Sequence, residues 1–369
     1  MSQKRFLFVL ILLIGLLPLS VASACGGLFC QNTAINQQAE RIIFTVNNDG
    51  TVSAYVQINY TGSAPDFSWV VPVPSVPEVD VAEMATFNEI QLLTDPIIVS
   101  PQMPDCAPIA VPMSVMADSE AVQEGGVEVL ASGTAGPFAY DVVTSEDSEA
   151  LIVWLNDNNY RITDEMRPLI AVYTDENMVF LAMKLQPEQG VQDIQPVVMT
   201  YEADYPTIPI RLTAVAAIPN MSIYTWVFAN EQAIPMNYAH PIIADDSIRG
   251  DFMQFGGTNY MSVVDQTVDL YAGRAFITEY AQPTTIFLEQ FPQDKLLKTL
   301  ANEYRYMTRL FGRMSPEEMT VDPSFELNGN QQNVDNLRNL SNLDPEIFWG
   351  CEEVPLNIEY DPDVVPQGF

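Results

Sequence analysis

Basic residues and histidine are scarce in this 369-residue chain. Lysine occurs only at positions 4, 184, 295 and 298, and His240 is the single histidine. A Ser–His–Asp or Cys–His catalytic system would have to use His240, with Asp245 or Asp246 as its orienting carboxylate. No G-x-S-x-G nucleophile turn accompanies it, and a lone histidine beside a proline is more often a loop residue. The sequence therefore argues against these mechanisms.

Recognisable metal-ligand sets are also missing. One histidine and four cysteines give no three ligands at zinc-site spacing. Clustered oxygen ligands for calcium occur at residues 156–159, 245–246 and 361–363, but none matches an EF-hand loop. Residues 156–159 (NDNN) are more simply a helix stop. No cofactor is predicted.

Only one long apolar run is present, at residues 6–21. It follows Lys4 and Arg5, contains Pro18 and precedes the A-x-A sequence ending at Ala24. This is the pattern of a secretory signal peptide, residues 1–24, with cleavage after Ala24. Sixteen residues are short of the roughly 20 that span a bilayer, although a retained anchor is the alternative. We expect an extracytoplasmic protein, secreted or associated with the cell envelope, with no membrane span after cleavage.

Cysteines are few but even in number: Cys25, Cys30, Cys106 and Cys351. Export favours disulfides, and four cysteines allow three connectivities. Cys25 with Cys30 would close a short loop containing two glycines, leaving Cys106 with Cys351. In the loop-closure model, closing that long loop with a disulfide would stabilise the folded protein by about 4–5 kcal/mol. It would also tie the C-terminal tail to the body. In the alternative, Cys25 is the lipid-modified first residue of a lipoprotein, which strands one thiol.

Acidic residues dominate the charge. The 15 basic residues include Lys4 and Arg5, so the mature chain keeps 13 against 48 acidic residues. Such a surface repels nucleic acid and anionic membranes and tolerates divalent cations. The partner is unknown, with divalent cations or an envelope component as candidates. With 48% hydrophobic residues, the chain can fill a core.

Strand signals run through most of the chain. Residues 41–46 and 51–60 flank an Asp-Gly turn and predict a hairpin. Residues 67–74 contain two prolines and predict an edge strand, or one ending at Pro72. Further strands are expected at 127–130, 139–143, 179–185, 195–201, 210–218, 222–228, 260–270 and 284–288.

Helix signals are fewer. A short helix is predicted at 82–93, and a pair at 146–174 with Ser145 and Thr163 as caps. The clearest apolar periodicity predicts a helix at 294–313, starting at Asp294. The fold class is therefore α+β: an antiparallel sheet-rich body, a helical pair and a longer C-terminal helix. We expect a body at 25–292 with an excursion at 100–126, then the amphipathic helix and acidic tail at 293–369.

Six segments carry a resemblance. They are residues 25–30 (CGGLFC), 40–44 (ERIIF), 69–74 (WVVPVP), 154–160 (WLNDNNY), 180–185 (FLAMKL) and 208–215 (IPIRLTAV). Together they resemble an exported bacterial family catalogued as domain of unknown function 2330, over most of residues 25–240. The resemblance implies a bacterial envelope or secreted setting and no catalytic residues.

The motifs are strand-shaping aromatic, proline and glycine residues rather than proton-transfer groups. The leading functional prediction is a non-enzymatic binding or structural module of the bacterial cell envelope. A secreted hydrolase using two carboxylates in a cleft competes with it, although 48 acidic residues prevent naming the pair. A calcium-dependent adhesion module is the third possibility.

Overall fold

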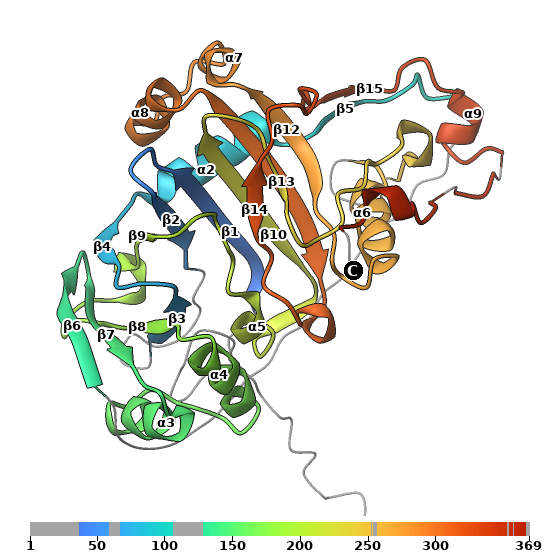
Figure 1. Cartoon of the computed structure of the whole chain (residues 1–369). Coiled ribbons are helices and arrows are strands. Elements are labelled where there is room, and N and C mark those ends of the chain that lie inside the picture. The colour runs from blue at the N-terminus through green and yellow to red at the C-terminus, as the bar shows by residue number, and fades with distance from the viewer. Residues whose placement is uncertain are drawn as a thin grey trace, which may run out of the picture.

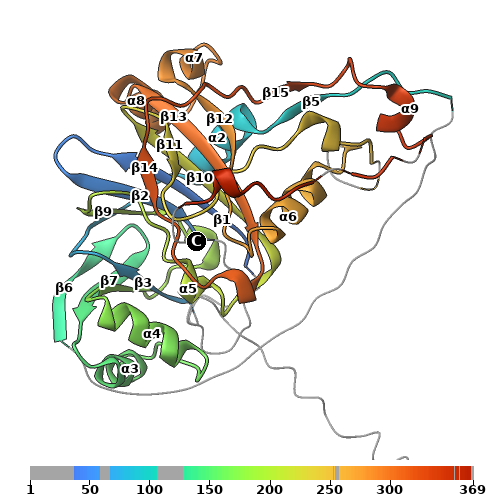
Figure 2. The same ribbon diagram turned by 45° about the vertical axis from the view of Figure 1, so that its right-hand side comes forward.

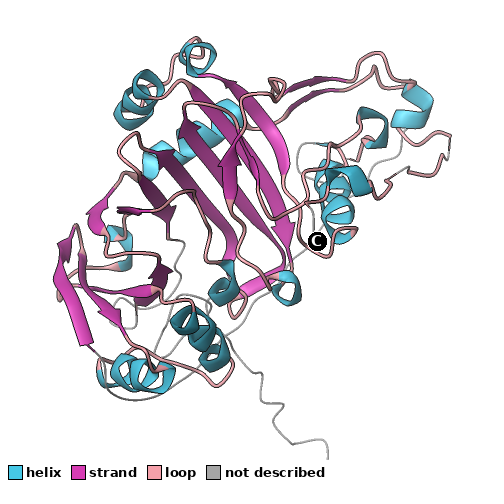
Figure 3. Cartoon of the chain, viewed as in Figure 1, coloured by secondary structure: helices cyan, strands magenta, loops and turns pink. Residues whose placement is uncertain are grey.

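Two β-sheets and the helices around them form the body of the protein in a computed structural model (Figure 1). The structure describes residues 37–58, 67–105, 128–251, 253, 257–352, 354–356 and 358–366. The predicted signal peptide with Ala24, and most of the predicted excursion at 100–126, lie outside these residues. Figure 3 shows strands and helices mixed along the chain, which confirms the α+β class.

The larger sheet has seven strands in the order β12-β13-β10-β1-β2-β9-β4. Their bounds are β1 Gln37–Val46, β2 Thr51–Gln57, β4 Glu78–Val81, β9 Val197–Glu202, β10 Ala217–Ala229, β12 Ile277–Pro283 and β13 Tyr306–Met314. Strands β1 and β10 pair in parallel and the other neighbours are antiparallel. Within this sheet, the expectation of antiparallel pairing is wrong for β1 and β10, because local hairpin signals do not reveal which distant strand becomes a neighbour.

The predicted N-terminal hairpin is confirmed. β1 and β2 pair in antiparallel register from Arg41 opposite Gln57 to Val46 opposite Val52. In the turn, Gly50 has φ of 87°, and the Asp49 carboxylate accepts the backbone N–H of Thr51 at 3.1 Å. The Asp-Gly signal therefore works through a glycine that takes the left-handed conformation.

The smaller sheet has four strands in the order β3-β8-β7-β6. Their bounds are β3 Ser68–Val73, β6 Glu128–Ala135, β7 Phe138–Thr144 and β8 Val179–Leu185. β3 pairs only with β8 among the described strands, so it is the edge strand that its prolines predicted.

Three predicted helices are present as α2 Met84–Thr94, α3 Ser148–Asp157 and α4 Met166–Asp175. The cap of α3 is Asp147, whose side chain accepts the N–H of Glu149 at 2.9 Å, rather than Ser145. Residues 156–159 end α3, with Asn159 at φ of 58°. Helix α4 has Glu165 at its N-cap without a side-chain cap hydrogen bond, so the predicted Thr163 cap is wrong, whereas the helical pair at 146–174 is confirmed.

The predicted long helix at 294–313 is wrong. Helix α8 spans Lys295–Glu303, with Asp294 as its N-cap, and the chain becomes extended at Tyr304. Residues 306–314 form β13, between β10 and β12 in the large sheet. Both faces of this strand are covered, so its apolar residues do not alternate, and a short apolar run does not distinguish strand from helix.

Three predicted strands are helical. Residues 210–218 contain helix α5 Ile210–Thr213 before β10 begins, residues 260–270 form α6 Tyr260–Asp269, and residues 284–288 form α7 Thr284–Leu288. In α6, the buried residues Val263, Val264, Thr267 and Val268 recur at helical spacing. Tertiary packing of this face overrides the β-branched composition.

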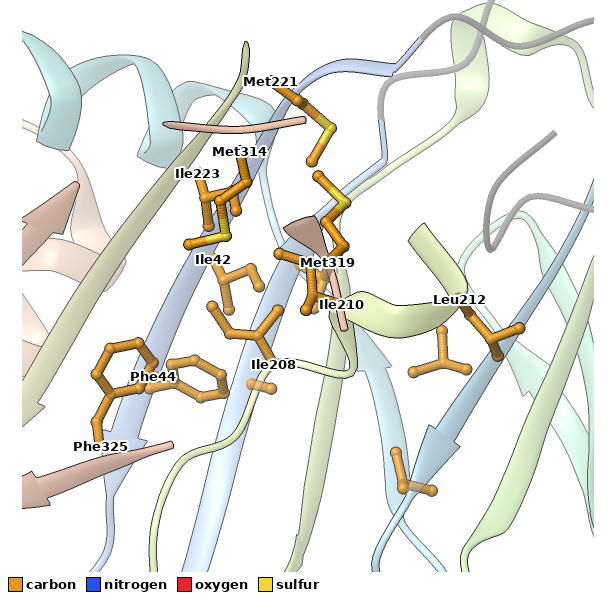
Figure 4. Close-up of a cluster of buried hydrophobic side chains, with 14 of the residues drawn as sticks. Ile42, Phe44, Ile208, Ile210, Leu212, Met221, Ile223, Met314, Met319 and Phe325 are labelled. Atoms are coloured by element: carbon orange, nitrogen blue, oxygen red, sulfur yellow. The ribbon is translucent and has the colours of Figure 1, made fainter. Parts of the chain in front are cut away.

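The two faces of the large sheet enter different cores. Ile42 and Phe44 of β1 face one way and join the cluster that includes the smaller sheet, α3 and α4. Ile43 faces the other way and joins a second cluster with α2, α7 and α8. Figure 4 shows Ile42 and Phe44 in one cluster with Ile208 and Phe325. Alternation along a β-strand produces this division.

A two-stranded parallel arm leaves the body, made of β5 Ile97–Val99 and β15 Leu337–Asn339 (Figure 2). Another small sheet pairs β11 Ala233–Pro235 with β14 Phe325–Leu327, and helix α9 spans Pro345–Phe348. Short 3-10 turns occur at Val191–Asp193, Asp245–Ser247, Pro316–Glu318 and Pro362–Val364. None of the described helices is long and apolar enough to cross a bilayer.

Candidate functional site

A cavity of about 750 Å³ lies between the two sheets. Strands β1, β2 and β9 form one wall, edge strand β3 forms the opposite wall, and residues 203–213 and 320–324 complete the lining. This volume suits a small-molecule ligand, for which typical sites measure about 300–1,000 Å³.

The wall from the large sheet is apolar because the strand register aligns one face. Phe44 lies opposite Ala54, and Ala54 lies opposite Met199 on the next strand. Ile42 and Val56 form the neighbouring pair of the same face. All five residues line the cavity, and the residues between them face the second core. Trp69 and the rest of β3 supply the facing wall.

Glu40 places a carboxyl group in this wall. It lies two positions before Ile42, where the apolar run of β1 begins, and is 8% exposed. Among the described residues, the side chain that donates to it is Thr213, whose hydroxyl lies 3.5 Å from Oε2. Burial raises the pKa of Glu40 to about 7, the Thr213 hydrogen bond opposes the rise, and the charge of Asp322 adds to it.

Arg211 of α5 joins two further carboxylates at the cavity. Its Nε and Nη2 donate to Oδ2 of Asp322 at 3.0 and 2.6 Å. Its Nη1 and Nη2 donate to the two carboxylate oxygens of Glu176 at 2.7 and 2.6 Å. Desolvation lowers the pKa of Arg211, but these hydrogen bonds outweigh it and the pKa is raised. The Arg211 guanidinium is therefore paired with two carboxylates of the protein itself.

Asp322 is held from several directions. Its Oδ1 accepts the Tyr173 hydroxyl at 2.9 Å and the backbone N–H of Arg211 at 3.1 Å. The Arg211 guanidinium also stacks 4.3 Å from the centre of the Tyr173 ring. Burial raises the pKa of Asp322, and the hydrogen bonds from Arg211 and Tyr173 oppose the rise. This arrangement fixes α4, α5 and the 320–324 segment relative to one another.

The lining is acidic. Among the described residues that form it, five carry carboxyl groups and one, Arg211, carries a positive charge. The carboxyl residues are Glu40, Glu176, Glu202, Asp204 and Asp322. Glu176, Glu202 and Asp204 are exposed, so they form a rim, whereas Glu40 is buried.

His240 and Asp245, candidates for one catalytic system by sequence, have different partners in the structure. His240 Nε2 lies 2.7 Å from the Thr278 hydroxyl, and its backbone N–H donates to the Val364 carbonyl at 3.0 Å. Asp245 pairs with Arg338 at 2.8 Å instead. Burial lowers the pKa of His240 to about 4. This histidine is a structural link to the C-terminal segment.

The other polar clusters have local roles. The Asn156 side chain accepts the N–H of Ile162 at 3.2 Å, and the Asp361 side chain accepts the N–H of Asp363 at 2.9 Å. No group of three or more His, Cys, Asp or Glu residues within the described part of the chain is arranged to hold a metal ion.

Cys351 is disulfide-bonded. Cys25, Cys30 and Cys106 lie outside the described residues, so the pairing stays a prediction. Two residues before Cys351, the Trp349 indole N–H donates to the Pro101 carbonyl at 3.1 Å, and the parallel arm pairs residues 97–99 with 337–339.

Sequence reasoning missed Glu40, Arg211 and Asp322 as a site. One signal was present: three of the six segments that carry the family resemblance supply cavity residues. These segments are 40–44, 69–74 and 208–215. Asp322 lies outside all six, and nothing in the sequence singled it out among the acidic residues.

Fold and cavity together define an α+β protein of two sheets with an apolar-walled, acidic-rimmed cavity between them. The chain belongs to the family described as "Uncharacterized protein conserved in bacteria (DUF2330)", whose profile matches residues 19–326. This confirms the resemblance and extends it beyond residue 240. No curated protein and no solved structure matches the chain.

Proposed function

We propose that this protein is a non-enzymatic ligand-binding module of the bacterial cell envelope, with the cavity between its sheets as the binding site. Residues 1–24 would export it, and the mature chain would begin at Cys25. The observation that carries the proposal is the cavity of about 750 Å³ walled by apolar side chains of β1, β2 and β9.

The condition of the polar groups favours binding over catalysis. Both oxygens of Asp322 accept hydrogen bonds from Arg211 or Tyr173, and Glu176 is paired with the same arginine. Groups held in this way orient a ligand and keep the site in shape, but they offer no free nucleophile. Glu40 is the exception, because a single long hydrogen bond holds it.

A cavity-filling variant tests the proposal. Ala54 is 3% exposed and lies at the centre of the apolar wall, so Ala54→Phe should fill the cavity. Ala139→Phe, at an exposed position of β7, is the matched control. We expect the mature wild-type chain and the control to bind the neutral apolar dye Nile red, measured by fluorescence, and Ala54→Phe to bind it at least tenfold more weakly. Equal binding by folded Ala54→Phe would overturn the proposal.

A carboxylate-based hydrolase is the second candidate, and the environment of Glu40 is the observation that favours it. A carboxylic acid with a pKa of about 7 can act as a general acid near neutral pH. Release of nitrophenol from nitrophenyl glycosides or esters, reduced at least 100-fold in Glu40→Gln, would support this candidate over a binding module. No turnover of either class by the wild type would count against it.

A further inference from the structure

We propose that the cavity binds a small organic cation, an amine or guanidine attached to an apolar body, with the Glu40 carboxylate as its partner. This inference rests on the proposed function of the cavity as a ligand site and adds the chemical class of the ligand.

The charges at the cavity exclude an anionic ligand on physical grounds. Arg211 is the one positive side chain among the described lining residues, and four of its N–H···O contacts go to Glu176 and Asp322. Two carboxylates therefore surround one guanidinium, and the group as a whole is negative. Glu202 and Asp204 add negative charge at the rim. A carboxylate or phosphate ligand would meet repulsion here, whereas a cation would be attracted.

Glu40 supplies an incompletely satisfied partner inside the cavity. Glu40 is 8% exposed, and the hydrogen bond that it accepts from the Thr213 hydroxyl is long, at 3.5 Å. A carboxylate has room for about four hydrogen bonds. An ammonium or guanidinium group donates several, so it would satisfy Glu40 where a neutral apolar ligand would leave it unpaired.

The remaining walls suit an apolar body rather than a bare ion. Ile42, Phe44 and Met199 line one side and Trp69 the other. The cavity volume of about 750 Å³ is far larger than the volume of a metal ion. Aromatic faces also attract organic cations, and Trp69 and Tyr201 are both in the lining.

Binding should depend on pH through Glu40 because a cation favours its ionised form. Thr213 hydrogen-bonds Glu40 and the charge of Asp322 acts on it. Arg211, Tyr201 and Glu176 are further titratable groups in the lining of the same cavity. Burial raises the pKa of Tyr201, so it stays neutral at these pH values. Since burial raises the pKa of Glu40 to about 7, the affinity for an amine should increase as pH rises from 5 to 7.

Three probes of one shape test the charge preference: 2-phenylethylamine, 2-phenylethanol and 3-phenylpropionate. Isothermal titration calorimetry with the mature full-length chain should show the amine binding at least tenfold more tightly than the alcohol, and the propionate more weakly still. In Glu40→Gln, the advantage of the amine should fall about tenfold and its increase between pH 5 and 7 should disappear. Asp157→Asn, an exposed acid at the end of α3, is the matched control and should behave as wild type.

Two outcomes would overturn the inference separately from the proposed function. If the alcohol binds as tightly as the amine, and Ala54→Phe abolishes both, the cavity is a ligand site without cation preference. If Glu40→Gln keeps the full amine preference, Glu40 is not the partner. Thr213→Val provides a second variant should Glu40→Gln fail to fold. It removes the hydrogen bond that lowers the pKa of Glu40, so the rise in amine affinity should move to higher pH, and an unchanged pH dependence would overturn the role of Glu40. If none of the three probes binds and Ala54→Phe binds Nile red as tightly as wild type, the proposed function itself is wrong.

Discussion

Arg309 and Glu279 form an ion pair of 2.9 Å inside the large sheet, with side chains 2% and 1% exposed. Arg309 also contacts Asp95 at 2.7 Å, and the Tyr260 hydroxyl donates to Glu279 at 2.7 Å. Burial raises the pKa of Glu279, and the charge of Arg309 opposes the rise. The pair therefore joins β12 and β13 to α6 and to the end of α2.

Removing one partner of this pair should be costly. Arg309→Met leaves Glu279 buried without its counter-charge, and we expect a loss of about 3–5 kcal/mol in the free energy of unfolding. Urea denaturation measures it. Arg167→Met is the control, because the Arg167–Glu149 pair is largely exposed and should contribute less than about 1 kcal/mol. Similar losses in the two variants would contradict the assigned role of Arg309.

Glu40 should make the protein less stable as pH rises. Its folded pKa of about 7 lies above the ordinary 4.5, so the folded state binds this proton more tightly than the unfolded state. The protonated Glu40 contributes about 3 kcal/mol to the free energy of unfolding. This contribution is full below pH 4.5 and is lost as pH rises through 7. Glu40→Gln should match wild type in urea denaturation at pH 5 and exceed it at pH 8. Equal stability of the two at pH 8 would show that Glu40 ionises without cost.

His240 should make the protein less stable as pH falls. Its folded pKa of about 4 lies below the ordinary 6.5, so the unfolded state binds this proton more tightly. The neutral His240 contributes about 3 kcal/mol to the free energy of unfolding. This contribution is full above pH 6.5 and is lost as pH falls towards 4. Because His240 is the single histidine, its imidazole resonance can be titrated directly by NMR. A midpoint near 6.5 would refute the buried neutral state.

The disulfide of Cys351 should fix the C-terminal segment, and we expect Cys106 as its partner. The Trp349–Pro101 hydrogen bond and the β5–β15 pairing bring the flanking segments together. Mass spectrometry of peptides from the unreduced mature protein should recover a Cys106–Cys351 link and a Cys25–Cys30 link. Cys351→Ser should cost about 2–5 kcal/mol in urea denaturation. A peptide joining Cys351 to Cys25 or Cys30 would refute this pairing.

Local chemistry explains where prediction succeeded. The Asp-Gly turn, the prolines of β3 and the polar stop after α3 each act over a few residues, so the sequence alone placed the first hairpin, the edge strand and the helical pair. One failure came where an apolar run is buried on both sides, and another where a β-branched segment packs one helical face, as in α6. Residues 306–314 have helical spacing but form a strand, because β10 and β12 were available to pair with them.

The sequence by itself determined the acidity of the protein, its family resemblance, the first hairpin, the edge strand β3 and the helical pair. Tertiary structure alone decided the site. Glu40, Arg211 and Asp322 are far apart along the chain, and they meet because β1, α5 and the 320–324 segment close around one cavity. Hydrogen bonding and burial then set their charges, since the cost of desolvating a carboxylate depends on neighbours that no local pattern encodes.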